Sequence, residues 1–169
     1  MAGLVWEFKT FEALDKAQLY AALQLRAEVF VVEQACVFQD MDGSDDRAMH
    51  LLGLYGGELV AYARCFEPGV KFAEASIGRV LSRGSVRGTG IGHVLMREAV
   101  ARLQQHWGTQ PIRIGAQAHL KHFYERHGFA DAGAPYVEDG IDHLEMLRAA
   151  QVTTGQNQSG VGHDHEFCR

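Results

Sequence analysis

The chain has 169 residues, of which 47% are hydrophobic and 22% charged, and its formal net charge is -5. These values describe one ordinary soluble domain, and a net negative chain without a Lys/Arg cluster argues against nucleic acid as the main partner. No apolar run approaches membrane-spanning length and the N-terminus lacks a signal-peptide core, so we expect no membrane partner and a cytoplasmic location. Three widely spaced cysteines predict reduced thiols in place of a disulfide framework.

The first predicted elements are a short strand and an amphipathic helix. Residues 5–8 form an apolar run typical of a strand. Asp15 is placed to cap a helix, with Gln18 as its capping-box partner. The apolar stripe of that helix continues to Phe30, and the polar Glu33 lies near its end.

Residues 36–47 form an Asp- and Gly-rich loop. The acids do not follow the spacing of a calcium-binding loop and its terminal Glu is absent, so we expect no metal there. The loop is either solvated or attracts a cationic amine.

Two strands follow, over residues 49–55 and 59–66, joined by a Gly-Gly turn. His50 opens the first strand, and a structural role is the commoner one for a lone histidine. Arg64 lies inside the second strand, where an unpaired buried charge is costly. We therefore expect it to extend to solvent, pair with an acid or face a cleft.

The most informative stretch joins a strand over 76–81 to a helix over 91–107 through the loop Arg87-Gly88-Thr89-Gly90-Ile91-Gly92. The first N–H groups of a helix lack internal partners and carry partial positive charge, and glycines allow a phosphate to approach. The sequence therefore predicts a phosphate or pyrophosphate cradle. The Lys-Ser/Thr ending of a nucleotide-hydrolysing loop is absent, and the glycine spacing differs from that of a dinucleotide-binding fold.

The remaining predicted elements are a strand over 111–116, a short helix over 120–127, and strands beginning at 129, over 136–138 and over 143–147. A strand–helix–strand unit implies one parallel pair. Residues 150–169 have a different, polar composition, and we expect a disordered tail there.

Two motifs carry a family resemblance. The spacing Arg87-x-x-Gly90-x-Gly92 resembles the pyrophosphate loop of the GNAT superfamily of acyl-CoA-dependent N-acyltransferases, and residues 123–129 resemble another motif of that superfamily. The blocks LQLRAEVFVVEQ, QDMDG, VAYAR, IGRV, GAQAHL and EDGIDH resemble its ElaA-type branch. The resemblance implies a GNAT domain over 5–149. Its expected fold is α/β (α+β): a mixed, mostly antiparallel sheet of six or seven strands, flanked by about four helices.

The resemblance also implies acetyl-CoA as co-substrate, an amine acceptor and a set of site residues. The pyrophosphate would lie on the Arg87–Gly92 loop and Tyr124 would protonate the departing thiolate. Further cofactor contacts would come from Val80, Leu81, Ser82 and Gln117, although many members have Asn in place of Gln117.

The general base is open at this stage. Glu74, on the central strand but two residues further out than the catalytic glutamate of some superfamily members, is the first candidate, with His50, Glu33 or a water chain as rivals. Glu33, His50 and Arg64 are assigned to the acceptor side.

Alternatives to acetyl transfer remain. A faint likeness around Arg26 and Glu33 to acyl-homoserine-lactone synthases gives one, and a non-catalytic acyl-CoA-binding module gives another. The acceptor is either a small molecule or a peptide amine, and the fold allows a homodimer.

Overall fold

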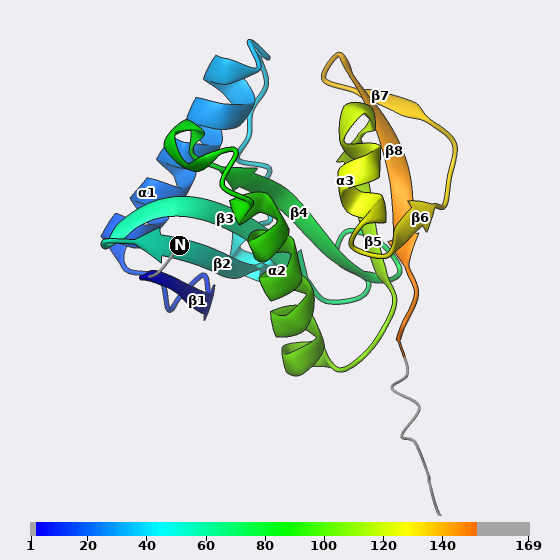
Figure 1. Ribbon diagram of the computed structural model, residues 1–169, viewed down its shortest axis with the longest axis horizontal. Coiled ribbons are helices and arrows are strands. Elements are labelled where there is room, and N and C mark those ends of the chain that lie inside the picture. The colour runs from blue at the N-terminus through cyan, green and yellow to red at the C-terminus, as the bar shows by residue number, and fades with distance from the viewer. Residues whose placement is uncertain (1–2, 152–169) are drawn as a thin grey trace, which may run out of the picture.

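The structure is a computed structural model that describes residues 3–151, so the predicted tail lies largely outside the described residues. One mixed sheet in the order β1-β2-β3-β4-β5-β8-β6, with β7 on β8, organises these residues (Figure 1). Its strands are β1 Leu4–Thr10, β2 Met49–Tyr55, β3 Glu58–Phe66, β4 Ala75–Ser82, β5 Ile112–Gln117, β6 Phe129–Asp131, β7 Tyr136–Glu138 and β8 Ile141–Arg148. The α-helices are α1 Lys16–Arg26, α2 Ile91–Trp107 and α3 Lys121–Glu125.

The predicted fold class is confirmed, but its counts differ. The described residues form eight strands where six or seven were expected, because the short β6 and β7 each pair separately with β8. They form three α-helices where about four were expected. The first predicted helix is continuous in the chain but widens to a π-helical segment, Ala27–Glu33, after α1.

Local sequence signals explain the helix boundaries. Asp15 accepts a hydrogen bond from the backbone N–H of Gln18, whose side chain bonds back to the Asp15 N–H, so the predicted capping box is confirmed. Gly108, at φ 85°, ends α2 in a conformation that suits glycine.

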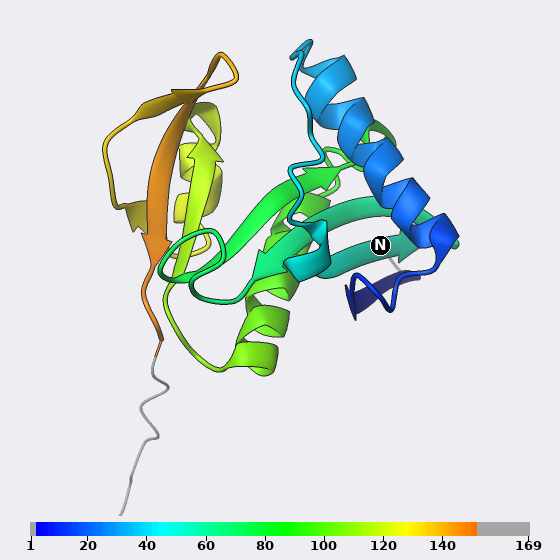
Figure 2. The ribbon, with the colours of Figure 1, turned by 180° about the vertical axis from the view of Figure 1, so that it is seen from behind.

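Helices cover both faces of the N-terminal half of the sheet (Figures 1 and 2). On one face α2 packs its buried stripe, including Leu95, Ala99 and Leu103, against β3 and β4. On the other face α1 places Ala22 and Leu25 against Tyr62 of β3. The half that carries β1–β4 is therefore a three-layer core.

The sheet divides between β4 and β5. These two strands are parallel and pair only through Ala75–Ile112 and Ser76–Arg113, after which they diverge (Figure 1). Every other strand pair is antiparallel. Beyond Ser76, one edge of β4 therefore has no partner strand. The backbone groups on that edge face an opening in the sheet.

Candidate active site

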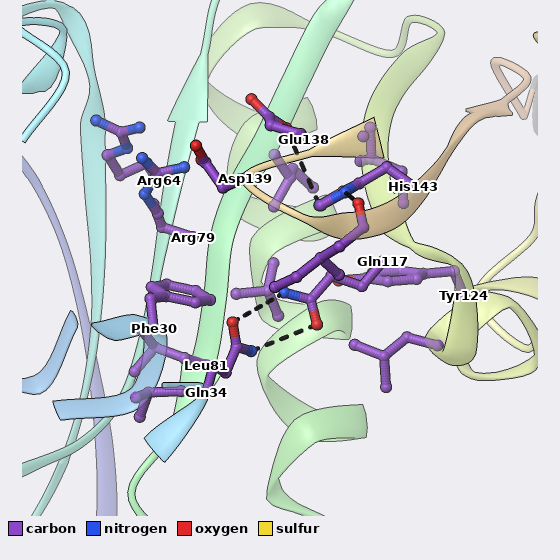
Figure 3. A pocket seen from close by; sticks show the side chains of 18 of the residues that line it. Phe30, Gln34, Arg64, Arg79, Leu81, Gln117, Tyr124, Glu138, Asp139 and His143 are labelled. Atoms are coloured by element: carbon purple, nitrogen blue, oxygen red, sulfur yellow. Dashed lines mark hydrogen bonds and ion pairs between the residues drawn. The ribbon is translucent and has the colours of Figure 1, made fainter. Parts of the chain in front are cut away.

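A cavity of about 1060 Å³ fills this opening. Its walls come from the π-helical segment, the 36–47 loop, β4 and the start of α2 on one side, and from β5, α3, β7 and β8 on the other. Figure 3 shows Phe30, Gln34, Arg79 and Leu81 on the first wall, facing Gln117 and His143 on the second. A volume of this size suits a substrate larger than a few atoms.

The glycine loop leaves the N-terminus of α2 open. Gly90 caps the helix at φ 84° and Gly88 lies at φ 80°, and no atom comes within 4 Å of a β-carbon built at either position. Among the described residues, no side chain caps this helix. The first N–H groups of a 17-residue helix are thus available to an anion, which is the chemistry of a pyrophosphate cradle.

Arg87 lies on the first wall of the cavity, where two partners hold it. Its guanidinium donates to the carbonyl oxygen of Ser82 at 2.9 and 3.2 Å and pairs with Glu33 at 2.7 Å. The Thr89 hydroxyl donates to the Val86 carbonyl at 2.6 Å. Arg87 therefore links the end of β4 to the π-helical segment, and the Glu33 carboxylate is occupied by that ion pair.

A β-bulge shapes the central strand. Tyr62 faces Leu81 and Arg64 faces Gly78, so two residues of β4 oppose one of β3. The bulged Arg79 has φ 51°, which is uncommon for a residue with a side chain. Its guanidinium donates to the Asp40 carboxylate at 2.7 Å and to the Asp40 carbonyl at 3.0 Å. The bulge turns the strand at Val80–Ser82, which line the cavity.

Buried ion pairs surround that bulge. Arg26, whose side chain is 1% exposed, donates to Asp40 at 2.6 Å and to Asp45 at 2.7 Å. Arg64 donates to both oxygens of Asp42 at 2.8 Å and to Asp45 at 3.0 Å. The hydrogen bonds from Arg64 lower the pKa of Asp42 well below its usual range.

Three acids of the 36–47 loop, Asp40, Asp42 and Asp45, therefore serve as counter-charges to arginines of α1, β3 and β4. Arg64 was expected to extend to solvent, to pair with an acid or to face a cleft. It pairs with acids and also lines the cavity.

Tyr124 of α3 lines the cavity from a buried position. Burial raises the pKa of its phenol to about 12. No hydrogen bond to its hydroxyl is present among residues 3–151. Its ring lies edge-on to Phe123 and Phe129, at 5.1 and 6.1 Å between centroids, which fixes its direction. A neutral phenol without an internal partner can donate its proton to a group that enters the cavity.

Gln117 ends β5 and makes a reciprocal amide pair with Gln34 across the cavity (Figure 3). The two N···O distances are 3.2 and 3.4 Å. The Cys36 thiol also reaches the Asp139 carbonyl at 3.2 Å. These contacts join the two walls at the side where the π-helical segment meets β7 and β8.

Glu74 and His50 lie away from the cavity lining, as do Gly88, Thr89, Gly90 and Ile91 of the predicted pyrophosphate loop. Glu74 precedes β4, and both its carboxylate oxygens accept from Arg113, at 2.8 and 2.9 Å. Those hydrogen bonds lower the pKa of Glu74 to about 2, so it is a weak base. His50 is buried, with one ring nitrogen 2.6 Å from the Tyr62 hydroxyl and the other 2.9 Å from the Asp45 carbonyl. Burial lowers its pKa, and both nitrogens are engaged.

Tyr136 and His143 are among the ionisable side chains of the cavity lining that the sequence analysis did not single out. Their rings stack at 5.4 Å between centroids and 25° between planes. His143 lies in the EDGIDH block, so the block resemblance was the one signal that pointed to it.

The described residues contain no group of three or more His, Cys, Asp or Glu side chains that could hold a metal ion. Within 3–151, every helix is too short or too polar to cross a membrane.

Comparisons with known proteins agree with this geometry. The family described as acetyltransferase (GNAT) domain matches residues 14–149. Protein ElaA of Escherichia coli is 43% identical over 145 residues, covering 85% of this chain and 95% of ElaA. The crystal structure of Escherichia coli ElaA matches with a TM-score of 0.79 at 42% identity, covering 86% of this chain and 99% of that one.

An acyl-CoA N-acyltransferase from Pseudomonas aeruginosa matches with a TM-score of 0.82 at 42% identity, over 86% of this chain and 99% of that one. The chain therefore belongs to the GNAT family of acetyltransferases and, within it, to the ElaA-type branch.

Proposed function

We propose that this protein transfers the acetyl group of acetyl-CoA to a primary amine, using the domain formed by residues 5–149. The observation that carries the proposal is the parting of β4 from β5 beside the uncapped start of α2. A thioester on a long phosphorylated carrier needs both features. The opening between the strands can hold the extended arm of the carrier, and the helix start can bind its phosphates. A cytoplasmic location and a homodimer are predicted from the sequence alone.

The donor site follows from the free backbone groups. The pyrophosphate would be held by N–H groups of the Arg87–Gly92 loop, and the pantetheine by backbone groups of Val80–Ser82 that face the opening. A backbone N–H of the bulged strand can also polarise the thioester carbonyl, because charge develops on that oxygen as the amine attacks. Gln117 would adjoin the donor only after exchanging its bond to Gln34.

The chemistry needs one bond made and one broken. The amine nitrogen forms a bond to the thioester carbon, and the carbon–sulfur bond then breaks to release a thiolate. Tyr124 would donate its proton to that sulfur. The phenol would be regenerated with the proton that the new amide nitrogen releases. Its raised pKa keeps it protonated until a strong acceptor is adjacent.

The test is turnover with a defined amine panel: tyramine, spermidine, Nα-acetyl-lysinamide and a tripeptide with a free α-amine. Thiol release from acetyl-CoA is followed by colorimetry, and the acetylated amine by mass spectrometry. We expect at least one amine to be acetylated and no comparable thiol release without amine. Tight acetyl-CoA binding without acetylation of any amine would favour the non-catalytic acyl-CoA-binding module.

A further inference from the structure

His143 occupies a defined place in the cavity wall. It pairs with Gln117 across the β5–β8 ladder, and residues directly opposite in antiparallel strands project to the same side. Gly115 and Glu145, the next pair on that face, also line the cavity. Ile114 and Ala116 alternate to the face packed with the α2 core. His143, in β8, therefore lies on the face of the β5–β8 pair that points away from the α2 core.

The hydrogen bonds of His143 fix its tautomer. Its Nδ1 lies 2.7 Å from the Ile141 carbonyl oxygen, which can only accept, so Nδ1 carries the proton. In the neutral ring Nε2 is then the unprotonated nitrogen. The group facing it is the Glu138 carboxylate, 4.0 Å away, which can stabilise an imidazolium (Figure 3).

The ring is also held in place. Its side chain is 11% exposed, and Tyr136 stacks on it. A β-carbon at Gly115 would collide with the Tyr136 hydroxyl, so glycine at that position makes room for the stack. A base that is oriented by a carbonyl and by a neighbouring ring is pre-organised for proton transfer.

The other candidates for the base are less suitable. Glu74 is bound by Arg113 away from the cavity lining, His50 has both nitrogens engaged, and Glu33 is paired with Arg87. Among the described residues that line the cavity, His143 combines an orienting partner on one nitrogen with an unprotonated second nitrogen.

We propose that His143 is the general base of the acetyl transfer; this rests on the proposed function. Nε2 removes one proton from the acceptor ammonium, and the freed lone pair forms the bond to the thioester carbon. The imidazolium beside Glu138 then passes that proton to solvent. The second proton of the amine replaces the one that Tyr124 gives to sulfur, so one proton is released per turnover. Of the ionisable groups on neighbouring elements, Tyr136 and Glu138 of β7 contact or face the ring. Asp139 of the turn, Glu145 of β8 and His119 after β5 line the same cavity.

The test compares His143→Asn with His122→Asn, a control on α3 whose side chain is 93% exposed. The probe is the panel amine that the wild-type protein acetylates fastest. At pH 7 we expect kcat of His143→Asn to fall by about 10²- to 10⁴-fold, with acetyl-CoA affinity unchanged. The loss should shrink as pH rises towards about 10, where an alkyl amine deprotonates in solution. Imidazole in the buffer should partly restore His143→Ala, because the small base can enter the space left by the ring.

Two outcomes would overturn the proposal. One is His143→Asn with near-wild-type kcat and an unchanged pH profile. The other is a loss that neither pH nor imidazole reduces and that comes with weaker acetyl-CoA binding or a lower Tm, because that pattern indicates a structural role. Failure of the wild-type protein to acetylate any panel amine would instead overturn the proposed function, so the two failures are distinguishable.

Discussion

The two walls of the cavity are built in different ways. The β4 wall is backed by buried ion pairs, in which Arg26 and Arg64 are 1% and 2% exposed and join the 36–47 loop to α1 and to β3. The β5–β8 wall has partly exposed ion pairs and holds its functional side chains by ring contacts and single hydrogen bonds. The first wall presents backbone atoms, whose positions depend on the bulge at Arg79. The second presents the side chains of Tyr124 and His143, which need only local support. The buried ion pairs therefore support the β4 wall, where the atoms proposed to bind the cofactor belong to the main chain.

The largest expected effect comes from removing the acid at the centre of the ion pairs. Asp40→Ala leaves Arg26 and Arg79 without their carboxylate, and breaking a buried pair costs about 3–5 kcal/mol. Urea unfolding measures the change. Asp46→Ala, in the same loop but exposed, is the control, and we expect its unfolding free energy to change by less than about 0.5 kcal/mol. Equal stabilities for the two variants would contradict the role of the ion pairs.

A change on the opposite wall should alter rate far more than stability. Tyr124→Phe removes only a hydroxyl that has no partner within 3–151, so its Tm should stay close to that of the wild type. We expect kcat with the best panel amine to fall by about 10²-fold. Tyr20→Phe, at an exposed position of α1, is the control. Since the pKa of Tyr124 is about 12, its ionisation should produce no loss of wild-type activity below pH 10.

Acid should weaken the β4 wall first. Arg64 lowers the pKa of Asp42, so its charged form is bound more favourably in the folded than in the unfolded state. This stabilisation is fully present above the unfolded pKa of about 3.9 and is lost as pH falls towards the lower folded value. We expect it to be on the order of 1 kcal/mol. Thermal unfolding between pH 6 and 3 should show a smaller acid dependence for Asp42→Asn. An unchanged slope would show that Asp42 does not carry the effect.

The smallest expected effect concerns the amide pair between the walls. Gln34→Ala removes two hydrogen bonds to Gln117, which are worth roughly 0.5–1.5 kcal/mol each when fully formed. Because these hydrogen bonds are long, we expect the loss of unfolding free energy to lie at the lower end of that range. Gln105→Ala, on the exposed side of α2, serves as control in the same urea experiment. If Gln34→Ala is as stable as the control, the pair contributes nothing to holding the walls together.

The sequence predicted those parts of the fold that depend on neighbouring residues. The capping box at Asp15, the Gly108 helix end and the hairpin after Tyr55 all follow from local patterns, and all are present. The open start of α2 was expected from the glycine loop on the same grounds.

Features that depend on distant partners were not predictable from local patterns. The bulge at Arg79 depends on Asp40, 39 residues away, and the amide pair joins Gln34 to Gln117 over 83 residues. The placement of Glu74 beside Arg113 has the same origin, because only the register of β4 on β5 brings them together. His143 acquires its orientation from the turn before it and from Tyr136, which a residue pattern alone does not specify.

In the proposed function, acetyl-CoA binds between the two walls with its phosphates at the start of α2. Isothermal titration calorimetry of the wild-type protein, Gly90→Glu and Gly57→Glu with acetyl-CoA tests it most directly. Gly90 and Gly57 share φ 84° and open surroundings, so backbone strain is matched and the cradle is changed in one variant alone. We expect micromolar binding by the wild type and by Gly57→Glu, and loss of binding by Gly90→Glu. Equal binding by both variants, or no binding by the wild type, would show that the start of α2 is not the phosphate site.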